Sequence, residues 1–297
     1  MTGGVSSFGL GGTIAHLVLV CGAKAAGMGG KALPALLAYQ RRAFPWHERR
    51  HSFVQRRAAA VITAAASSDR TVRFHSPAVG ALHALVADHV VQGRVIFPGV
   101  GYLEMARAAV GKRKALQGVY FLQPLAVEAP GLLVEAAVFE DGRFEVRSGS
   151  EAGAMEDATM HCSGETSDSN VWQPVDCSSL KISLRAANVG TLYDSFDAVG
   201  LQYGPGYRTL AQAWGGANKS AARLRKRVKI MGGAHVHPAD LDGSLHASAV
   251  MDAVVGGGGE TRLPFAVDDA LLQNSASVEL WAVRRLPPAC TRSKNDG

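Results

Sequence analysis

The residues of this chain whose types and spacing best suit chemistry begin at His89, in the stretch His89-Val-Val-Gln-Gly93-Arg-Val-Ile-Phe-Pro98-Gly99. A glycine follows the histidine, a proline follows the glycine, and a helix-like pattern then begins. Histidine has the side-chain pKa closest to neutrality, so an imidazole can accept a proton at working pH. This order predicts a general base held on a turn at the mouth of an apolar tunnel.

A second set of ionisable residues lies far along the chain, in His237-Pro-Ala-Asp240-Leu-Asp242-Gly-Ser-Leu-His246. Helix positions four apart face the same way, so Asp242 and His246 can hydrogen-bond on one helical face. A carboxyl group beside an imidazole is suited to proton transfer. For this pair to act with His89, the fold must bring the two segments together.

These two segments, and Gly200-Leu-Gln-Tyr203-Gly204-Pro205-Gly-Tyr207 between them, resemble motifs of dehydratase domains in modular polyketide and fatty acid synthases. The family's motifs are HxxxGxxxxP, YGPxF and HPxxLDxxxQ/H, and they occur here in the family's order over most of residues 51–285. Tyr207 stands where the family more often has Phe. The family's HPLLG start reads His51-Ser-Phe-Val-Gln here, a departure that bears on the first strand and touches no catalytic position.

The resemblance implies a hydro-lyase that removes water from a 3-hydroxyacyl thioester and leaves the trans-2-enoyl thioester. It implies that neutral His89 is the catalytic base, and that Asp242, kept protonated by an apolar site, is the catalytic acid. A helix N-terminus near Gly99 would polarise the thioester carbonyl. The supporting and substrate-binding residues that the resemblance implies are Gly93, Pro98, Gly99, Tyr203, Gly204, Pro205 and His246.

Such a reaction needs no metal or nucleotide cofactor. The chain has no convincing serine for phosphopantetheine attachment, so the substrate is expected on the phosphopantetheine arm of an acyl carrier protein domain. Other polyketide synthase domains are expected partners too. Family members often pair as dimers, so a homodimer is a further expectation.

Three alternative interpretations stay open. His89 before a glycine can be structural, Asp242 can cap a helix, and Tyr203 can be a core residue with a satisfied hydroxyl. A metal-dependent enzyme would use a zinc or iron site made of His235, His237, Asp242 and His246. A catalytically inactive dehydratase-like scaffold or substrate-holding module would keep the fold without the reaction.

The resemblance implies an α+β fold, the double hotdog, in which two antiparallel sheets each wrap a central helix. Local patterns agree with it. Glu140-Asp-Gly142 separates two strand-like runs and predicts a hairpin, and an apolar face predicts a helix over 99–110. Helices are also predicted over 189–199 and from about Leu241. Strand-like runs occupy 263–269 and 278–284.

The N-terminus resembles a different domain. Gly4-Val-Ser-Ser-Phe-Gly-Leu-Gly-Gly-Thr-Ile-Ala-His16 is similar to the C-terminal strand and loop of ketosynthases, with Ile14 where that family has Asn. The expected division is a ketosynthase-like remnant (1–20), a linker (21–50), an N-terminal hotdog (51–165), a connector (166–180), a C-terminal hotdog (181–288) and a disordered tail (289–297).

Composition agrees with a globular protein, because 47% of the 297 residues are hydrophobic and 19% are charged. No apolar run approaches the roughly 18 residues that cross a bilayer. A secretion signal begins with basic residues, and this chain has no Lys or Arg before Lys24. The four cysteines form no CxxC pair, which favours reduced thiols. We therefore expect a cytoplasmic protein with no membrane partner.

The net charge of +6 is partly concentrated in Arg223, Arg225, Arg227 and Lys229, which alternate and would share one face of a strand. Such a face either stays solvated and protects a sheet edge, or receives an acidic partner such as the carrier protein. No aromatic residue interleaves these charges, so we expect no nucleic-acid partner.

Overall fold

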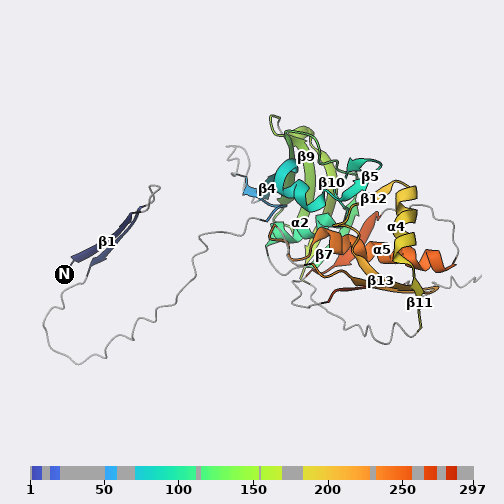
Figure 1. Cartoon of the computed structure of the whole chain (residues 1–297). Coiled ribbons are helices and arrows are strands. Elements are labelled where there is room, and N and C mark those ends of the chain that lie inside the picture. The colour runs from blue at the N-terminus through green and yellow to red at the C-terminus, as the bar shows by residue number, and fades with distance from the viewer. Residues whose placement is uncertain are drawn as a thin grey trace, which may run out of the picture. The chain divides into compact units, whose positions relative to one another are not determined.

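The structure is a computed structural model of the whole chain, shown in Figure 1. It describes residues 2–8, 14–20, 51–58, 71–111, 115–153, 155–168, 183–227, 232–255, 264–272 and 279–285. The chain divides into two compact units, Met1–Trp46 and His47–Gly297. No helix among these described ranges is long and apolar enough to cross a membrane.

The first unit contains an antiparallel hairpin of β1 (Thr2–Phe8) and β2 (Ile14–Val20), in which Ser6 lies opposite His16. These strands fall within the segment that resembles a ketosynthase terminus, and that assignment stays a prediction. The predicted linker over 21–50 lies outside the described residues.

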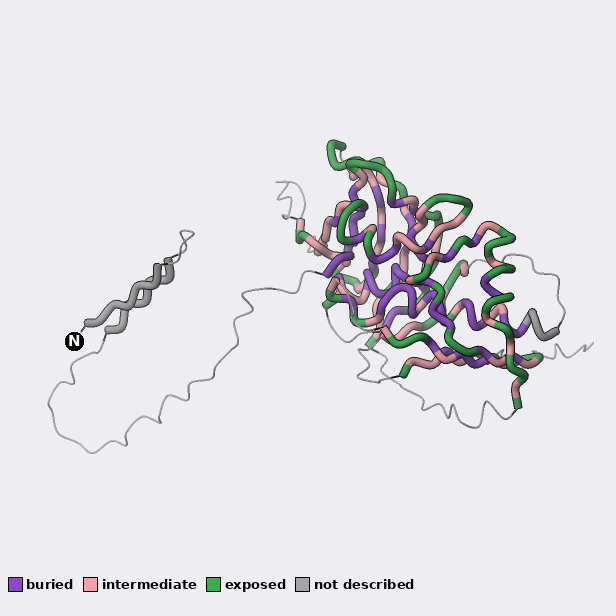
Figure 2. Tube along the Cα trace, viewed as in Figure 1, coloured by how far each residue is buried: buried purple, intermediate pink, exposed green. Residues whose placement is uncertain are grey.

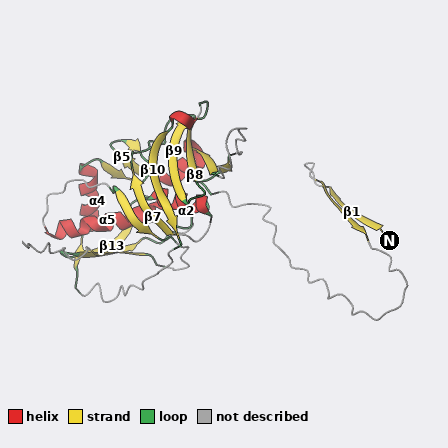
Figure 3. Cartoon of the chain, turned by 180° about the vertical axis from the view of Figure 1, so that it is seen from behind, coloured by secondary structure: helices red, strands yellow, loops and turns green. Residues whose placement is uncertain are grey.

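The second unit is built first around a seven-stranded antiparallel sheet, in the order β15-β7-β10-β9-β8-β4-β3. Its strands are β3 (Arg56–Arg57), β4 (Val72–Pro77), β7 (Ala115–Phe121), β8 (Leu132–Val138), β9 (Arg143–Ser150), β10 (Thr159–Ser167) and β15 (Ala266–Ala270). The helix α2 (Gly101–Val110) packs on β7, β8 and β9, which lie in front of it in Figure 3. A short 3-10 turn, η2 (Met155–Asp157), precedes β10.

Local sequence explains these elements. Gly142 has a φ of 90°, the positive value that the predicted hairpin between β8 and β9 requires. The apolar face predicted for the helix is confirmed, because Tyr102, Met105, Ala106 and Ala109 are buried in the main core. Figure 2 shows this buried layer running through α2 and the strands against it. The helix ends where Gly111 adopts a left-handed conformation.

A second sheet has the order β11-β13-β14-β16. Its strands are β11 (Arg185–Ala187), β13 (Leu210–Gly215), β14 (Lys219–Leu224) and β16 (Trp281–Arg285). The long helix α5 (Pro238–Val255) packs on β11, β13, β14 and β16, and α4 (Val189–Ala198) contacts β13 and α5. Each large sheet thus has one central helix, as the double hotdog requires.

A small third sheet, β12-β5-β6, joins the two halves of the unit. It pairs β12 (Leu201–Tyr203) with β5 (His89–Val91), and β5 with β6 (Arg94–Val95). The segment η1 (Ala78–Leu82), whose backbone is not helical at Val79 and Gly80, and the helix α1 (His83–Val86) lead into β5.

Several boundaries differ from the sequence-based expectations. The helix expected from Gly99 starts at Gly101, and the helix expected near Leu241 starts at Pro238. β10 continues to Ser167, so the connector expected from 166 starts at least two residues too early. Residues 51–55 form no strand beyond an isolated bridge between His51 and Val54.

Two strands of the second half, β15 and β14, differ from what the sequence predicts. β15, from the region assigned to the C-terminal hotdog, pairs with β7 in the N-terminal sheet. The strand β14 ends at Leu224, so the predicted basic face does not continue along a strand to Arg227. The glycine loop at 256–259 and the expected tail at 289–297 lie outside the described residues.

Candidate active site

His89 lies on a tight hairpin that explains the glycine of its motif. Gln92 and Gly93, with φ values of 49° and 76°, form the turn between β5 and β6. Positive φ at both central residues matches the twist of a two-residue hairpin, and Gly adopts it without strain. The hairpin returns the chain so that Ile96 reaches His89, where the Ile96 N–H donates to the His89 carbonyl over 3.1 Å.

The same hairpin fixes the tautomer of His89. Nδ1 of His89 lies 2.7 Å from the carbonyl oxygen of Ile96. A carbonyl only accepts, so Nδ1 carries the proton and donates it. In the neutral imidazole the lone pair is therefore on Nε2, which is the nitrogen that faces Asp242.

The structure brings His89 and Asp242 together from different sheets. Nε2 of His89 lies 3.8 Å from Oδ2 of Asp242, and both side chains are buried. This separation exceeds a hydrogen bond, and Oδ2 of Asp242 has no hydrogen-bond partner among the described residues. The two groups are thus close enough to act on one small group and too far apart to satisfy each other.

His246 lies one helical turn after Asp242, as its spacing predicts. Its Nε2 is 2.9 Å from Oδ2 of Asp242, although the angle between them is not that of a hydrogen bond. On its other side, Nδ1 of His246 lies 3.3 Å from the hydroxyl of Tyr193, which itself accepts the Leu210 N–H. The Tyr193 hydroxyl then donates to Nδ1, so a neutral His246 carries its proton on Nε2, the nitrogen that lies beside the Asp242 carboxylate.

The electrostatics of Asp242 correct one expectation. Burial raises the pKa of Asp242, but the positive charges that His246 and His89 carry when protonated lower it by more. The net pKa lies below the ordinary value of an aspartate, so the resting carboxyl is ionised near neutral pH. The expectation that an apolar site keeps Asp242 protonated is therefore wrong, because two imidazoles outweigh the desolvation.

Aromatic rings complete the surroundings of the pair. Tyr203 lies opposite His89 in the strand register, and its ring centroid is 5.5 Å from that of His89 and 4.2 Å from that of His246. The Tyr207 ring is 5.3 Å from His89. Burial raises the pKa of Tyr203 and of Tyr207, so both phenols stay neutral donors. Tyr207, at the family's Phe position, donates its hydroxyl to the Leu85 carbonyl over 3.2 Å.

The residues before α2 form a close-packed corner. A Cβ on Gly99 would meet Phe121 at 3.5 Å and Pro264 at 3.6 Å. The N–H groups of Gly101, Tyr102 and Leu103 donate to the carbonyls three residues before them, so they are already used. Within the described chain, no protein acceptor binds the N–H of Gly99 or Val100.

The alternative metal cluster does not form. Among the described residues, no group of three or more His, Cys, Asp or Glu is arranged to hold a metal ion. His237 instead caps α5, where its Nδ1 accepts the Ala239 N–H over 3.1 Å. Burial, reinforced by the charge of Arg227, lowers the pKa of His237 to about 3, so it is neutral. This cap, followed by Pro238 in the first turn, explains why the helix starts earlier than predicted.

Sequence reasoning missed the polar residues that surround His89 and Asp242. Asp88, Tyr193 and Arg227 make buried or half-buried polar contacts with residues next to His89 and Asp242, and Glu104 joins α2 to the segment before α5. Asp88 is adjacent to His89 and Glu104 lies on the otherwise apolar face of α2, which are the signals that could have singled them out.

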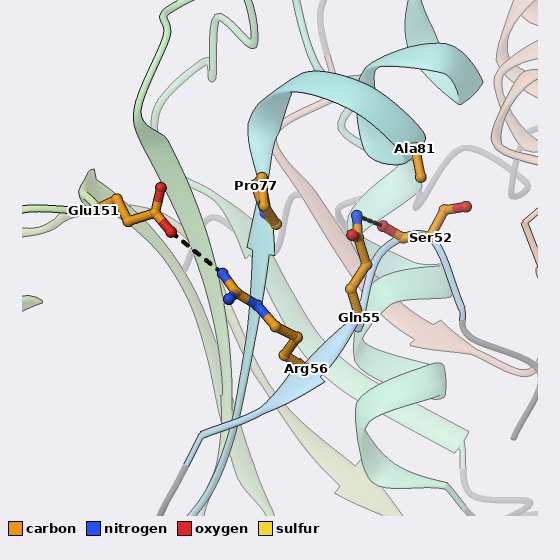
Figure 4. Close-up of a pocket in the computed structure, with 6 residues that line it drawn as sticks. All are labelled: Ser52, Gln55, Arg56, Pro77, Ala81 and Glu151. Carbon is orange, nitrogen blue, oxygen red and sulfur yellow. Dashed lines mark hydrogen bonds and ion pairs between the residues drawn. The ribbon is translucent and has the colours of Figure 1, made fainter. Parts of the chain in front are cut away.

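A hollow of about 560 Å³ on the same unit does not contain the pair. Ser52, Gln55, Arg56, Pro77, Ala81 and Glu151 line it, as Figure 4 shows. Its ion pair, Arg56 to Glu151 at 3.3 Å, is exposed on both sides. The predicted acyl tunnel beside His89 remains a prediction.

Comparisons with known proteins agree with this architecture. One family model, described as a polyketide synthase dehydratase domain, matches residues 60–150, and another, described as a polyketide synthase dehydratase N-terminal domain, matches residues 178–296. Polyketide synthase ThaG of Burkholderia thailandensis is 28% identical over 67% of this chain, and polyketide synthase GfsB of Streptomyces halstedii is 32% identical over 68%. In each case the match spans 4% of that protein's length.

A solved structure shares the fold. The crystal structure of a CurK dehydratase inactive mutant superposes with a TM-score of 0.66 at 22% identity, covering 80% of this chain and 88% of that one.

Proposed function

The chain belongs to the polyketide synthase dehydratase family and has its double-hotdog fold, and from this premise we propose that it removes water from a 3-hydroxyacyl thioester to give the trans-2-enoyl thioester. The observation that carries this proposal is the 3.8 Å gap between Nε2 of His89 and Oδ2 of Asp242. A lone pair and an unpartnered carboxylate oxygen face each other there in a buried site. That arrangement suits a substrate hydroxyl and an adjacent acidic carbon.

In the proposed reaction, Nε2 of His89 takes the proton of the carbon next to the thioester. The carbon–carbon double bond forms as the bond to the hydroxyl breaks, and the proton on His89 leaves with that hydroxyl as water. Asp242 accepts a hydrogen bond from the hydroxyl beforehand, and its negative charge stabilises the imidazolium of His89 as it forms. His246 holds the Asp242 carboxylate. Both catalytic residues keep the importance implied by the resemblance, but Asp242 acts as a base-stabilising carboxylate rather than as a resting acid.

Negative charge also develops on the thioester oxygen. The N–H groups of Gly99 and Val100 at the start of α2 have no acceptor in the described chain, so they are suited to receive it. Gly93, Pro98, Gly204 and Pro205 would serve by shaping the two turns that hold His89 and Tyr203.

The names of two solved neighbours support these roles. CurK dehydratase is described as inactive in one variant that replaces a histidine by phenylalanine and in another that replaces an aspartate by asparagine. A histidine and an aspartate are the two residues that the proposed mechanism requires here.

The test is water loss measured by mass spectrometry, with 3-hydroxyacyl pantetheine thioesters of both hydroxyl configurations as substrates. We expect wild type to form the enoyl product, and His89→Ala and Asp242→Asn each to slow it by about 100-fold or more. Arg56→Met, which removes a surface ion pair, serves as the control. Undiminished water loss in either site variant would remove that residue from the mechanism, and no product from wild type with any thioester would favour the inactive scaffold.

The context of the reaction belongs to the same proposal. An acyl carrier protein would deliver the substrate on its phosphopantetheine, and the other domains of a polyketide synthase would surround the chain, as the relatives' names suggest. A homodimer and a cytoplasmic location are further predictions.

A further inference from the structure

Asp88, the residue before His89, holds the turn that follows Tyr203. The Asp88 carbonyl accepts the Gly204 N–H over 2.8 Å, and its Oδ2 accepts the Gly206 N–H over 2.6 Å. The approach is so close that a Cβ on Gly204 would lie 2.5 Å from Oδ1 of Asp88, and a Cβ on Gly206 would lie 2.6 Å from Oδ2. Because both positions are glycine, the backbone of this turn can pack directly against the Asp88 carboxylate.

The same turn is held from its other side by Arg227. Nη2 of Arg227 lies 3.3 Å from the carbonyl oxygen of Gly206, which accepts from it. The guanidinium also binds both carboxylate oxygens of Asp240, Oδ1 at 2.9 Å and Oδ2 at 3.3 Å. Gly206 therefore donates its N–H to Asp88 and accepts a hydrogen bond from Arg227 at its carbonyl.

The ends of this chain of contacts adjoin the two proposed catalytic residues. Asp88 immediately precedes His89, and Asp240 lies in the first turn of α5, two residues before Asp242. Asp240 is buried and the Arg227 side chain is only 23% exposed. A guanidinium with its donors turned inward on a buried carboxylate is poorly placed to receive an acidic partner, and its planar fork suits a fixed two-sided contact.

We propose that Asp88, Arg227 and Asp240 are positioning residues which, through Gly206, set the separation of His89 from Asp242. The proposal rests on the proposed dehydration, because it assigns these residues to the geometry of that reaction. Proton transfer depends steeply on the placement of its groups, and a displacement of about 1 Å can cost about 100-fold in rate. We call the contacts of Asp88, Arg227 and Asp240 around Gly206 the clamp. Loosening the clamp therefore slows the chemical step while the acyl chain still binds.

The experiment compares Arg227→Met, Arg227→Lys and the control Arg56→Met in the full chain, with kcat and KM measured separately on a 3-hydroxyacyl pantetheine thioester. Methionine keeps an apolar stem without the donors, and lysine keeps the charge as a single point. We expect kcat to fall at least about tenfold in Arg227→Met with KM changed less than about threefold, and Arg227→Lys to recover part of the loss. Arg56→Met should match wild type.

A second readout does not depend on activity. The ¹⁵N NMR shifts of the His89 imidazole report its proton and its surroundings, and they should change in Arg227→Met although the hydrogen bonds of Arg227 go to Gly206 and Asp240. Unchanged kcat and unchanged His89 shifts in a folded Arg227→Met would overturn the clamp. If Arg227→Met does not fold, the same two measurements on Arg227→Lys decide. A wild type without dehydratase activity whose His89 shifts still respond would refute the proposed function and leave the clamp standing.

Discussion

At the scale of single residues, burial and neighbouring imidazoles shift the pKa of Asp242 in opposite directions. Burial favours its neutral form, whereas His246 at 2.9 Å and His89 at 3.8 Å favour the carboxylate and prevail. An ionised Asp242 cannot be the resting proton donor. In the proposed dehydration, the proton that leaves with water is therefore the one that His89 has just taken.

This assignment predicts the pH dependence of kcat/KM. Because the pKa of Asp242 is lowered, its charge is already present over the pH range in which the proposed base acts. We expect kcat/KM to rise with pH in a single step, and we expect no fall of kcat/KM at higher pH that belongs to Asp242. Initial rates across the stable pH range measure it. A falling limb near or above neutrality that disappears in Asp242→Asn would instead identify Asp242 as a resting acid.

The contact of Asp88 with the glycine turn predicts a coupled effect on stability. Gly206→Ala places a methyl group against Oδ2 of Asp88 and should cost about 1–3 kcal/mol of unfolding free energy, as overpacking does. In an Asp88→Ala background the nearest remaining atom is the Cβ of residue 88 at 3.8 Å, so the added cost should fall by about 1 kcal/mol or more.

Gly204→Ala is the matched control for that cycle, measured by urea unfolding. Its new Cβ would lie 2.9 Å from the Cβ of residue 88, which alanine retains. Asp88→Ala should therefore relieve Gly204→Ala much less than Gly206→Ala. Equal, additive costs for both glycines would show that Asp88 does not set this turn.

At the scale of elements, α2 is tied to its surroundings by one buried carboxylate. Glu104 accepts from Arg107 through both oxygens, at 2.8 and 2.7 Å, and from the His235 N–H at 2.6 Å. His51 reaches the same carboxylate at 3.1 Å. The central helix, the start of the unit and the approach to α5 are thus joined at a single side chain.

Glu104→Gln should lower the free energy of unfolding at neutral pH by about 3 kcal/mol, because it leaves the Arg107 guanidinium without its counter-charge. Burial raises the pKa of Glu104, but His51, Arg107 and the His235 N–H lower it to about 2. A lowered folded pKa means that this stability is complete above the ordinary pKa of a glutamate and is lost as the pH falls toward about 2.

Urea unfolding of wild type and Glu104→Gln between neutral and acidic pH measures both effects. The variant should lose less stability on acidification than wild type. Glu151→Gln, in the exposed pair with Arg56, should change stability by less than about 1 kcal/mol. Parallel pH curves for wild type and Glu104→Gln would contradict the buried ion-pair account.

At the scale of the whole second unit, strands from the two halves of the chain pair with each other. β15 follows α5 in the chain but pairs with β7 in the first large sheet, and β12 of the second half pairs with β5 of the first. α2 and α5 also contact each other. The first large sheet therefore includes a strand from the second half, and the candidate site takes His89 from one half and Asp242 from the other.

This pairing between the two halves predicts that residues 47–297 unfold as one cooperative body. Calorimetry should give one main transition, with equal calorimetric and van 't Hoff enthalpies. Hydrogen exchange should assign the same opening free energy to the central amides of β9 and of β14, which lie in different sheets. Two separate transitions, or protection that differs between these strands by several kcal/mol, would show that the hotdogs fold independently.

The sequence by itself determined the features that depend on near neighbours. The apolar face of α2, the Asp-Gly hairpin between β8 and β9, the helix α4 and the shared face of Asp242 and His246 all follow from periodicity and turn chemistry over a few residues. The motif order also indicated the family and the double hotdog. These inferences succeeded because backbone preferences and helical spacing act locally.

Only the tertiary structure decided the contacts between distant segments. It placed Nε2 of His89 3.8 Å from Asp242, turned Arg227 from an expected surface charge into a partner of Asp240, and moved β15 into the first sheet. It also reversed the expected ionisation of Asp242, because the balance between burial and two imidazoles depends on distances that spacing along the chain does not contain. Local chemistry indicated the proposed reacting groups, and long-range packing set their charge and their separation.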